Sequence, residues 1–422
     1  MHYKHRFIIV ENLVVDAILG YDWLVLNGRT LDTTRLVLAG NVVVPYTVGQ
    51  HAFSFLAGVE DVEAKLDDKV FASAPTSIIA TLREMLQRYV ATMSLDGSIG
   101  TIACDPFQIE LDTDVPVKAK KRFHYSYTER VAIDELMDML LKNECVELSS
   151  SNFDANVVLA HRNGKSRLCV DYKPLNDRTV NFPHVMPRFE EMIDAMKGAV
   201  IFSKFDLPLG YHQIMIDERD RHKTAFTVQG HRHRGKFQWR RLPFCLKNGP
   251  MFFQATMEKI LRPILWQNCV VNVDDCLIWS KSIEDHPRDV ERYLQLVGAN
   301  NIKLKPEKLE LAVSSVEFVG HIISPAGVEI ATSKMEKLAK HPTPRNRKEL
   351  LSFLQFANFL RKHTPFFAQL TAPLYKISAA KLAKSDFVWS EQCQAAFEAV
   401  KKAFLEPPVL AFPNPQLPFR CY

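Results

Sequence analysis

Two adjacent carboxylates, Asp274 and Asp275, stand between the apolar runs NCVVNV and CLIWS. Carboxylates flanked by apolar strands are costly to bury unless something pairs with them. Neighbouring residues of a regular strand point to opposite faces, so both acids can serve one site only at the tip of a hairpin. At such a tip they would offer hard oxygen ligands of the kind that Mg²⁺ prefers. An isolated Asp-Asp pair is, however, more typical of a solvated turn.

A third carboxylate favours the metal site over the solvated turn. Asp206 ends the apolar run AVIFSKF, directly before a bend marked by Pro208 and Gly210. Between this run and Asp274 lies a stretch, residues 219–241, in which Lys and Arg alternate with aromatic side chains. Two strand ends that carry acids, with basic residues nearby, suit phosphoryl transfer. In that chemistry two divalent ions about 3.5–4 Å apart stabilise the attacking and leaving oxygens, while Lys and Arg hold the phosphates.

The elements that must position these acids can be predicted from hydrophobic periodicity. Helices are expected over about 78–89, 128–143, 189–196 and 252–261. Strands are expected at ANVVLAHR, RLCVDY and AVIFSKF, the first two joined by the turn residues Asn163-Gly164. Thr128 is expected to cap the second helix. Past residue 285 helices predominate, interrupted by a hairpin near VEFVGHIISPAGVEI. The pattern predicts a domain of mixed helix and sheet.

Composition excludes several classes of protein. The 422 residues carry a net charge of +5, with 47% hydrophobic and 24% charged residues, which are ordinary globular values and not those of a disordered, collagen-like or coiled-coil chain. The 8 cysteines never form C-x-x-C, so a zinc site is disfavoured and reduced thiols are expected. An apolar run of about 18 residues does not occur, nor does the apolar region of a signal peptide. We expect a soluble intracellular protein.

From about residue 126 to 414 the chain resembles the reverse transcriptase of gypsy-type LTR retrotransposon Pol polyproteins. Six blocks follow the order of that family: RLCVDYKPLN, FSKFDLPLGYHQI, KTAFTV, LPFCLKNGPMFFQ, VNVDDCLIWS, and KLKPEK with VEFVGHIIS. The Asp-Asp box alone would be weak evidence for this family, but six blocks in the same order are specific to it. The resemblance implies an α+β right-hand polymerase, with fingers and palm over 121–330 and a thumb over 331–384.

The same resemblance assigns roles to individual residues. The catalytic acids, which are also the ligands of two Mg²⁺ ions (or Mn²⁺), would be Asp206, Asp274 and Asp275. Contacts to the incoming dNTP are expected from Lys165, Arg167, Tyr211, Phe244 and Lys247. Contacts to the primer and its RNA or DNA template are expected from Asn272, Phe318, Val319, Gly320 and His321. Tyr211 would pack under the deoxyribose, unless it is simply a core aromatic. The basic region 334–362 would follow the duplex backbone, unless it is simply a solvated helix face.

The two ends resemble parts of neighbouring polyprotein domains. LVVDAILGYDWL, residues 13–24, is similar to the C-terminal part of a retroviral-type aspartic protease, but the catalytic D-[ST]-G loop is missing. We therefore expect residues 1–60 to be an all-β, truncated and inactive protease remnant, followed by a connector over 61–120. Residues 385–422 resemble the start of an RNase H-like domain, truncated before its first catalytic Asp. Protease and RNase H activities are not expected.

Departures from the family pattern leave two functional hypotheses. Asn272 stands where Tyr is usual, and loss of an aromatic contact to a base could cost about 1–3 kcal/mol. Cys245 stands where Gly is usual, which would cost roughly 1–2 kcal/mol of strain if φ is positive. Gly249 and Pro208 also depart from the pattern. We expect an RNA-directed DNA polymerase, weakened by these changes, that acts in cytoplasmic virus-like particles or the nucleus. The alternative is a silent relic that only binds nucleic acid. The oligomeric state is left open.

Overall fold

The structure of the chain is a computed structural model. It describes residues 35–38, 42–45, 68–71, 73–113, 115–119, 123–162, 165–207, 209–364, 366–378, 387–404, 410 and 412. The chain divides into two compact units, Met1–Glu60 and Asp61–Tyr422. In the first unit, β1 (Arg35–Leu38) and β2 (Val42–Pro45) pair antiparallel. The rest of the predicted protease remnant, and the turn at 163–164, lie outside the described residues.

The second unit is built around a four-stranded sheet that carries the predicted acids. Its strand order is β11 (Glu310–Val313), β6 (Ile201–Asp206), β10 (Asp275–Ser280) and β9 (Cys269–Asn272). All neighbouring pairs are antiparallel. Strand β10 is buried along nearly its whole length, as a central strand with helices on its face should be. The predicted strand AVIFSKF is thus confirmed, and it lies in the centre of the sheet.

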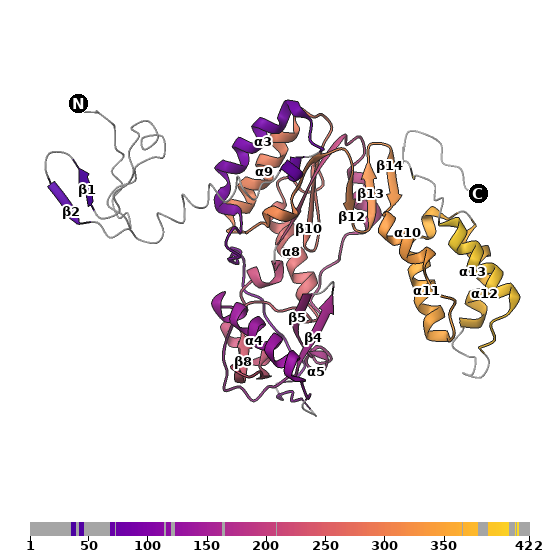
Figure 1. Cartoon of the computed structure of the whole chain (residues 1–422), viewed down its shortest axis with the longest axis horizontal. Coiled ribbons are helices and arrows are strands. Elements are labelled where there is room, and N and C mark those ends of the chain that lie inside the picture. The colour runs from indigo at the N-terminus through magenta and orange to yellow at the C-terminus, as the bar shows by residue number, and fades with distance from the viewer. Residues whose placement is uncertain are drawn as a thin grey trace. The chain divides into compact units, whose positions relative to one another are not determined.

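Helices α3 (Thr76–Arg88), α8 (Gly249–Leu261) and α9 (His286–Ala299) pack beside this sheet (Figure 1). Helix α3, predicted at 78–89, buries Ile78, Leu82 and Leu86 at helical spacing and contacts α9. Residues 68–111 therefore belong to the main hydrophobic core. The connector expected over 61–120, in which a helix was predicted, therefore contains residues that pack in this core.

A second group of elements lies next along the chain. A three-stranded sheet has the order β3 (Val146–Leu148), β8 (Arg234–Trp239) and β7 (Phe226–Gln229). The predicted hairpin of β4 (Val157–Arg162) and β5 (Lys165–Val170) is confirmed. Around them lie the helices α4 (Tyr127–Lys142), α5 (Lys173–Asn176) and α7 (Glu218–Arg221).

The capping residue of helix α4 lies two residues earlier than predicted. Ser126, rather than Thr128, is the capping residue, because its hydroxyl accepts a hydrogen bond from the backbone of Glu129 at 3.3 Å. The carboxylate of Glu129 in turn accepts one from the Ser126 backbone at 2.7 Å. This reciprocal capping box satisfies two donors at the start of the helix.

Strands β12 (Val316–Phe318), β13 (His321–Ser324) and β14 (Gly327–Ile330) form a small antiparallel sheet. The turn predicted at Pro325 to Gly327 joins β13 to β14. Helix α6 (Phe189–Ala195) packs on this sheet through Met192 and Ile193, in a core that also contains Phe318.

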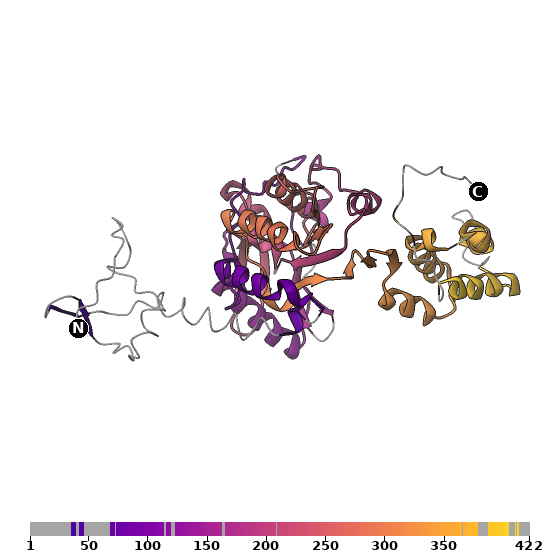
Figure 2. The same ribbon diagram turned by 90° about the horizontal axis from the view of Figure 1, so that it is seen from above.

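The C-terminal helices share one core: α10 (Thr332–Ala339), α11 (Arg347–Phe359), α12 (Phe367–Ser378) and α13 (Glu391–Ala403). They form a group of their own, coloured orange to yellow in Figure 2. Phe353 of α11 contacts Phe397 of α13 with ring centroids 4.7 Å apart. The predicted boundary at residue 384 therefore falls inside one packed core, and the assignment of 385–422 to an RNase H-like domain stays a prediction. In the described part of the chain, the helices are too short or too polar to cross a membrane.

Candidate active site

The three predicted acids meet where β6 ends and the β9–β10 hairpin turns. Asp206 is the last residue of β6 and Asp275 the first of β10, and these two are direct partners in the antiparallel register. Asp275 also pairs with Asn272 across the hairpin. Val273 and Asp274 are the two residues between the strands. The prediction that the backbone forms a hairpin tip at Asp274 is therefore confirmed.

The tip is held in an unusual backbone conformation. Val273 has φ of 55°, which is a real outlier for a β-branched residue. Its N–H donates to Oε1 of Gln254 at 2.7 Å, and Nε2 of Gln254 donates to the Val271 carbonyl at 2.9 Å. Gln254 lies on α8 and is fully buried. The helix therefore holds the β9 side of the tip at two points, which offsets the strain next to Asp274. Sequence reasoning did not find this residue.

Asp274 lies in the most electrostatically strained position of the three. Burial, and then the charges of Asp206 and Asp275, raise the pKa of its carboxyl to about 6, against an ordinary 3.8. Arg167 and Lys308 act in the opposite direction on the same group. Its Oδ1 is buried and has no hydrogen-bond partner among the described residues. Such a carboxylate is stabilised by any cation that reaches it.

The other two acids are paired with lysines. Lys308 Nζ lies 2.6 Å from Asp206 Oδ2, and Lys204 Nζ lies 3.4 Å from Asp275 Oδ1. Lys308 stands in the KLKPEK block, but neither lysine was assigned a role from the sequence. A lysine two residues before a strand-end acid looks like ordinary surface charge, so only the sheet register brings Lys204 to Asp275.

The residues present fit a divalent metal ion. Among the residues that the structure describes, there is no group of three or more His, Cys, Asp or Glu side chains that could hold a metal ion as they stand. The donor type is nevertheless suitable, because Asp206 and Asp274 both carry carboxylate oxygens and are near enough for the charge of Asp206 to raise the pKa of Asp274. The unpartnered Oδ1 of Asp274 is the direct observation that a cation is suited to this position.

Tyr211 closes one side of the site. It lies in the turn of 3₁₀ helix Gly210–Gln213 after β6, and its ring packs on Phe244 and Phe253 at centroid distances of 5.5 and 5.3 Å. Burial and the nearby Asp274 raise the pKa of the Tyr211 hydroxyl. A Cβ at position 210 would lie 3.0 Å from Asp274 Oδ1, so Gly210 permits the close approach of this turn to the acid.

The predicted basic residues differ in what they can do. Arg167 lies exposed on β5, and its positive charge lowers the pKa of the Asp274 carboxyl. It makes no ion pair within the described residues, so its guanidinium is available to an anion. Lys247 is already used, because its Nζ donates to the Thr179 carbonyl at 2.8 Å. The side chain of Lys165 lies outside the described residues, although its backbone belongs to β5.

The two departures from the family pattern have different surroundings. Asn272 is half-buried at the end of β9, opposite Asp275. Cys245 has φ of 74°, so the condition stated for strain at this position is met. Its carbonyl accepts a hydrogen bond from Asn176 Nδ2 at 2.8 Å, while Asn176 Oδ1 accepts one from the Lys247 backbone at 2.9 Å. The loop before α8 is therefore fixed in its left-handed turn.

The predicted primer-holding segment is anchored from beneath. Phe318 is fully buried, and His321 is 5% exposed and stacks on Phe189 at 4.2 Å. Val319 and Gly320 form the turn between β12 and β13, both with positive φ, and are partly exposed. The segment therefore offers the backbone of its turn to a partner, while the two ring side chains hold that turn in place.

A buried polar network ties the sheet together below the acids. Ser203 Oγ lies 2.7 Å from His286 Nε2, and Ser280 Oγ lies 2.9 Å from His286 Nδ1. Ser280 donates to Asp289 Oδ2 at 2.7 Å, so it must accept from Nδ1–H. Nε2 is then the acceptor for the Ser203 hydroxyl, whose oxygen accepts the Ala312 N–H at 2.9 Å.

This network connects β11, β6, α9 and β10 in a single chain of hydrogen bonds. All of its side chains are buried, and burial lowers the pKa of His286 to about 4, which keeps the ring neutral at neutral pH. A fully satisfied polar network of this kind fixes strand register. No sequence signal joined Ser203, Ser280 and His286.

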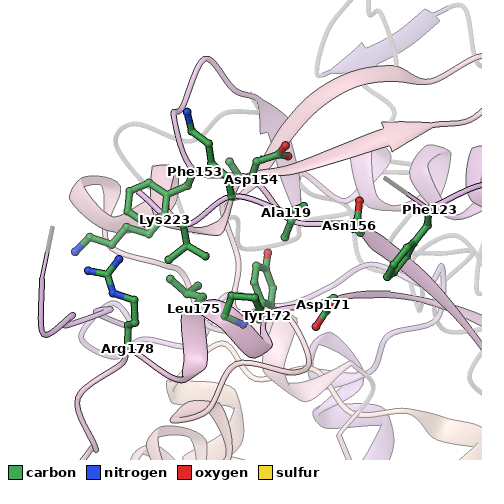
Figure 3. Close-up of a pocket in the computed structure, with 15 residues that line it drawn as sticks. Ala119, Phe123, Phe153, Asp154, Asn156, Asp171, Tyr172, Leu175, Arg178 and Lys223 are labelled. Atoms are coloured by element: carbon green, nitrogen blue, oxygen red, sulfur yellow. The ribbon is translucent and has the colours of Figure 1, made fainter. Parts of the chain in front are cut away.

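A cavity of about 600 Å³ lies beside β5 but does not include the acids. Figure 3 shows Arg178 and Lys223 on one side of it and Phe123 on the other. Both cations already serve the protein: Lys223 pairs with Asp220 at 2.7 Å, and Arg178 with Asp112 at 3.2 Å. The cavity therefore lacks a free charge from either residue for an anionic ligand.

The fold and the acid cluster together define a class of protein. The sequence profile of the reverse transcriptase (RNA-dependent DNA polymerase) family matches residues 158–323, a segment that contains all three acids. Residues 158–323 are thus a reverse transcriptase domain.

The relatives are polyproteins of transposable elements. The retrovirus-related Pol polyprotein from transposon 297 of Drosophila melanogaster is 28% identical over 300 residues, or 70% of this chain and 28% of the relative. That from transposon opus of the same species is 28% identical, over 74% and 32% of the two chains. The Tf2-3 polyprotein of Schizosaccharomyces pombe is 33% identical, over 66% and 20%. The chain thus spans about a third or less of the length of these relatives.

Solved structures confirm the right-hand polymerase fold. The foamy viral protease-reverse transcriptase dRH in complex with double-stranded DNA superposes with a TM-score of 0.75 at 21% identity, over 83% of this chain and 61% of the other. The same viral protein in complex with RNA/DNA hybrid gives 0.71 at 21% identity, over 88% and 48%. At this identity the likeness concerns the fold alone.

Proposed function

We propose that this chain supplies the RNA-directed DNA polymerase activity of a gypsy-type retrotransposon polyprotein, extending a primer 3′-hydroxyl with dNTPs on an RNA or DNA template. The observation that carries the proposal is the register pair Asp206–Asp275 with Asp274 at the adjacent tip. Three carboxylates at the ends of two paired strands can bind a cationic ligand, together with the phosphate groups that this cation would bring.

Asp206 and Asp274 would hold the metal, with Asp275 beside them. When bound, Mg²⁺ supplies charge stabilisation to the attacking and leaving oxygens of a phosphoryl transfer. The raised pKa of Asp274 favours this role, because a charge that is costly in the protein alone is stabilised by a cation. Gln254 holds the tip so that the carboxylate of Asp274 stays in place.

Arg167 would bind the triphosphate of the incoming nucleotide. Its exposed guanidinium has no ion-pair partner in the described chain, and a guanidinium binds phosphate oxygens in bidentate fashion. Tyr211 would form the floor under the sugar, since its ring is wedged between Phe244 and Phe253 and cannot easily move aside. A rigid ring at this place excludes a 2′-hydroxyl by contact.

The duplex would lie against the turn of Val319 and Gly320 and the basic helices α10 and α11. Complexes of the foamy viral protein with double-stranded DNA and RNA/DNA hybrid support this assignment by analogy of fold. We also propose that the chain works inside the cell, in virus-like particles or the nucleus, because its relatives are retrotransposon polyproteins.

The test is primer extension on poly(rA)/oligo(dT) with Mg²⁺ and dTTP. We expect the wild type to extend the primer and Asp274→Asn to lose extension while it still binds the duplex. Glu284→Gln, an exposed acid of the same unit, is the matched control and should extend normally. Equal loss of duplex binding and extension in Asp274→Asn would count against the assignment. An inactive wild type that binds duplex would support the relic.

A further inference from the structure

One lysine of the central sheet contacts both the acid cluster and the small sheet that carries the turn of Val319 and Gly320. Lys204 Nζ lies 3.4 Å from Asp275 Oδ1 and donates a hydrogen bond to the Glu317 carbonyl at 2.9 Å. Lys204 belongs to β6, whereas Glu317 belongs to β12. A single ammonium group therefore joins two sheets, between the surfaces to which we assigned the metal ion and the primer.

The strand register places this ammonium beside the acids. Lys204 stands two positions before Asp206 on β6, so the two side chains lie on the same face of the sheet. Asp275 is the register partner of Asp206 on β10, and Glu310 is the register partner of Lys204 on β11. The side chain of Lys204 is only 17% exposed. A cation buried to this extent needs partners for its donor hydrogens, and the acid and the carbonyl supply them.

The carbonyl of Glu317 is turned toward Lys204 by the geometry of the β12–β13 hairpin. Phe318 pairs with His321 directly beside the two-residue turn, and Glu317 belongs to the next pair. In an antiparallel hairpin the pair beside such a turn exchanges hydrogen bonds, and the backbone groups of the next pair point away from the partner strand. The bond from Lys204 therefore uses an outward-facing carbonyl, and it fixes β12 two residues before Val319.

The turn itself adapts poorly, so its place depends on the strands below it. Val319 has φ of 49° and Gly320 has φ of 77°. Positive φ at both central residues is what a type I′ hairpin turn requires, and it is costly for a β-branched side chain. Strand β12 also contacts β6 directly. A movement of β12 relative to β6 would thus carry the whole turn with it.

We propose that Lys204 is a positioning residue that holds the primer-binding turn in place relative to the acid cluster and competes with the metal ion for Asp275. This inference rests on the proposed function, because it assigns a support to the metal and primer surfaces named there. Lys204 acts on the primer through the backbone of Glu317, and on the metal ion through the charge of Asp275. The two actions have opposite signs, since the hydrogen bond favours duplex binding while the positive charge opposes cation binding.

Opposite signs predict a split between two binding constants. Lys204→Met keeps the aliphatic stem and removes the charge and the donor. We expect its Kd for Mn²⁺ to fall by about two- to fivefold, because a partly exposed ion pair no longer competes for the acid. Its Kd for a primer–template duplex should rise by about fivefold, at the low end of couplings between sites. A residue that only supports the fold would raise both constants.

The test consists of two equilibrium measurements on the full chain without nucleotide. Mn²⁺ binding is followed through the electron paramagnetic resonance signal of the free ion, in the absence of duplex. Duplex binding is followed by fluorescence anisotropy of a labelled primer–template in the presence of a chelator. Lys204→Arg keeps a charge and donors, so it should return both constants toward the wild type. Lys281→Met, at an exposed position directly after β10, is the matched control and should change neither constant.

Lys308→Met separates the effect of the hydrogen bond from the effect of charge. Lys308 also pairs with an acid of the cluster, Asp206, but within the described residues it makes no hydrogen bond to β12. Its removal should tighten Mn²⁺ binding as in Lys204→Met and weaken duplex binding far less. Equal weakening of duplex binding in the two variants would assign the effect to lost charge and would overturn the proposal.

Two further results would overturn it. One is duplex binding by Lys204→Met that equals that of the wild type, and the other is Mn²⁺ binding by this variant that is unchanged or weaker. Neither constant depends on catalysis. A failure of the proposed metal site would be seen separately, as Mn²⁺ binding that Asp274→Asn does not weaken, so the two failures are distinguishable.

Discussion

The ammonium of Lys308 lies 2.6 Å from Oδ2 of Asp206, an acid that precedes it by 102 residues. The lysine therefore competes with any metal ion for this carboxylate. We expect Lys308→Met to lower the Mg²⁺ concentration for half-maximal extension by about two- to fivefold, the range of a partly exposed ion pair. The measurement is a Mg²⁺ titration of primer extension.

Lys305→Met is the control for this experiment. Lys305 lies in the same segment and pairs with Glu307 at 3.9 Å rather than with a site acid, so its removal should leave the Mg²⁺ requirement unchanged. If Lys308→Met required more Mg²⁺ than the wild type, the lysine would be helping the metal to bind and not competing with it.

Neutralising Asp274 should stabilise the fold. Burial and two neighbouring acids raise the pKa of this carboxyl to about 6 from 3.8, so the folded protein holds the proton more tightly than the unfolded chain does. The stability due to that proton is complete below about pH 4 and is lost as the pH rises through about 6. Asp274→Asn stays neutral, so at pH 7.5 its free energy of unfolding should exceed that of the wild type by about 1–2 kcal/mol.

Urea unfolding at pH 7.5 and at pH 4, with a chelator present, measures this effect. The advantage of Asp274→Asn should shrink at pH 4, where the wild-type carboxyl is protonated in the folded state. Glu284→Gln should behave like the wild type at both pH values. An Asn variant that is less stable than the wild type at pH 7.5 would mean that the acid is not a source of electrostatic strain.

The left-handed backbone at Cys245 makes a second stability prediction. With φ of 74°, Cys245→Gly should raise the free energy of unfolding by about 1 kcal/mol, because the Cβ strain is removed. Cys245→Ala keeps the Cβ and loses the thiol, so it should show no such gain. Chemical denaturation under reducing conditions compares the two variants. An equal gain in both would assign the effect to the thiol and not to the backbone.

Asn272 leaves room for a functional gain. Its half-buried side chain lies beside the acids, opposite Asp275. An aromatic ring at this position could stack on a base, which is worth about 1–3 kcal/mol in comparable contacts. We expect Asn272→Tyr to lower the KM for the primer-template by about fivefold or more. Asn272→Leu, apolar but without a π-face, should not reproduce the gain.

The buried network around His286 should fail as a unit. His286→Leu leaves the hydroxyls of Ser203 and Ser280 without their ring partner in the core, and we expect a loss of about 2–4 kcal/mol in the free energy of unfolding. Adding Ser203→Ala to this variant removes one orphaned hydroxyl and should recover part of the loss. Losses that simply add would show that the two residues do not interact.

Local patterns predicted much of the fold and the site. The acids were found because apolar runs frame Asp206 and the Asp274–Asp275 pair, and strand alternation demands a hairpin tip for adjacent acids to cooperate. Helix α3 was found because Ile79, Leu82, Met85 and Leu86 recur at helical spacing, although the structure buries Ile78 rather than Ile79. The residues that make up each of these patterns lie within a few positions of each other, so the pattern can be recognised from the sequence alone.

What escaped prediction depends on contacts across long stretches of chain. Lys308, Gln254 and His286 carry no local mark of their roles, because their partners are brought to them by strand register and helix packing. The same reason explains why residues 68–111 were taken for a connector, although several of them pack in the main core. Phe397 likewise joins the core of α11 across a predicted domain boundary.

The strand order of the central sheet has a consequence for synthesis of the protein. Strand β6 pairs with β10 on one side and β11 on the other, and both follow it in the chain. While the ribosome adds the roughly 100 residues between β6 and β11, which takes about 5–20 s, this apolar strand has unpaired edges. Its edges are ready to pair with other nascent chains during that interval. Production of the chain should therefore improve with a chaperone that shields exposed strands.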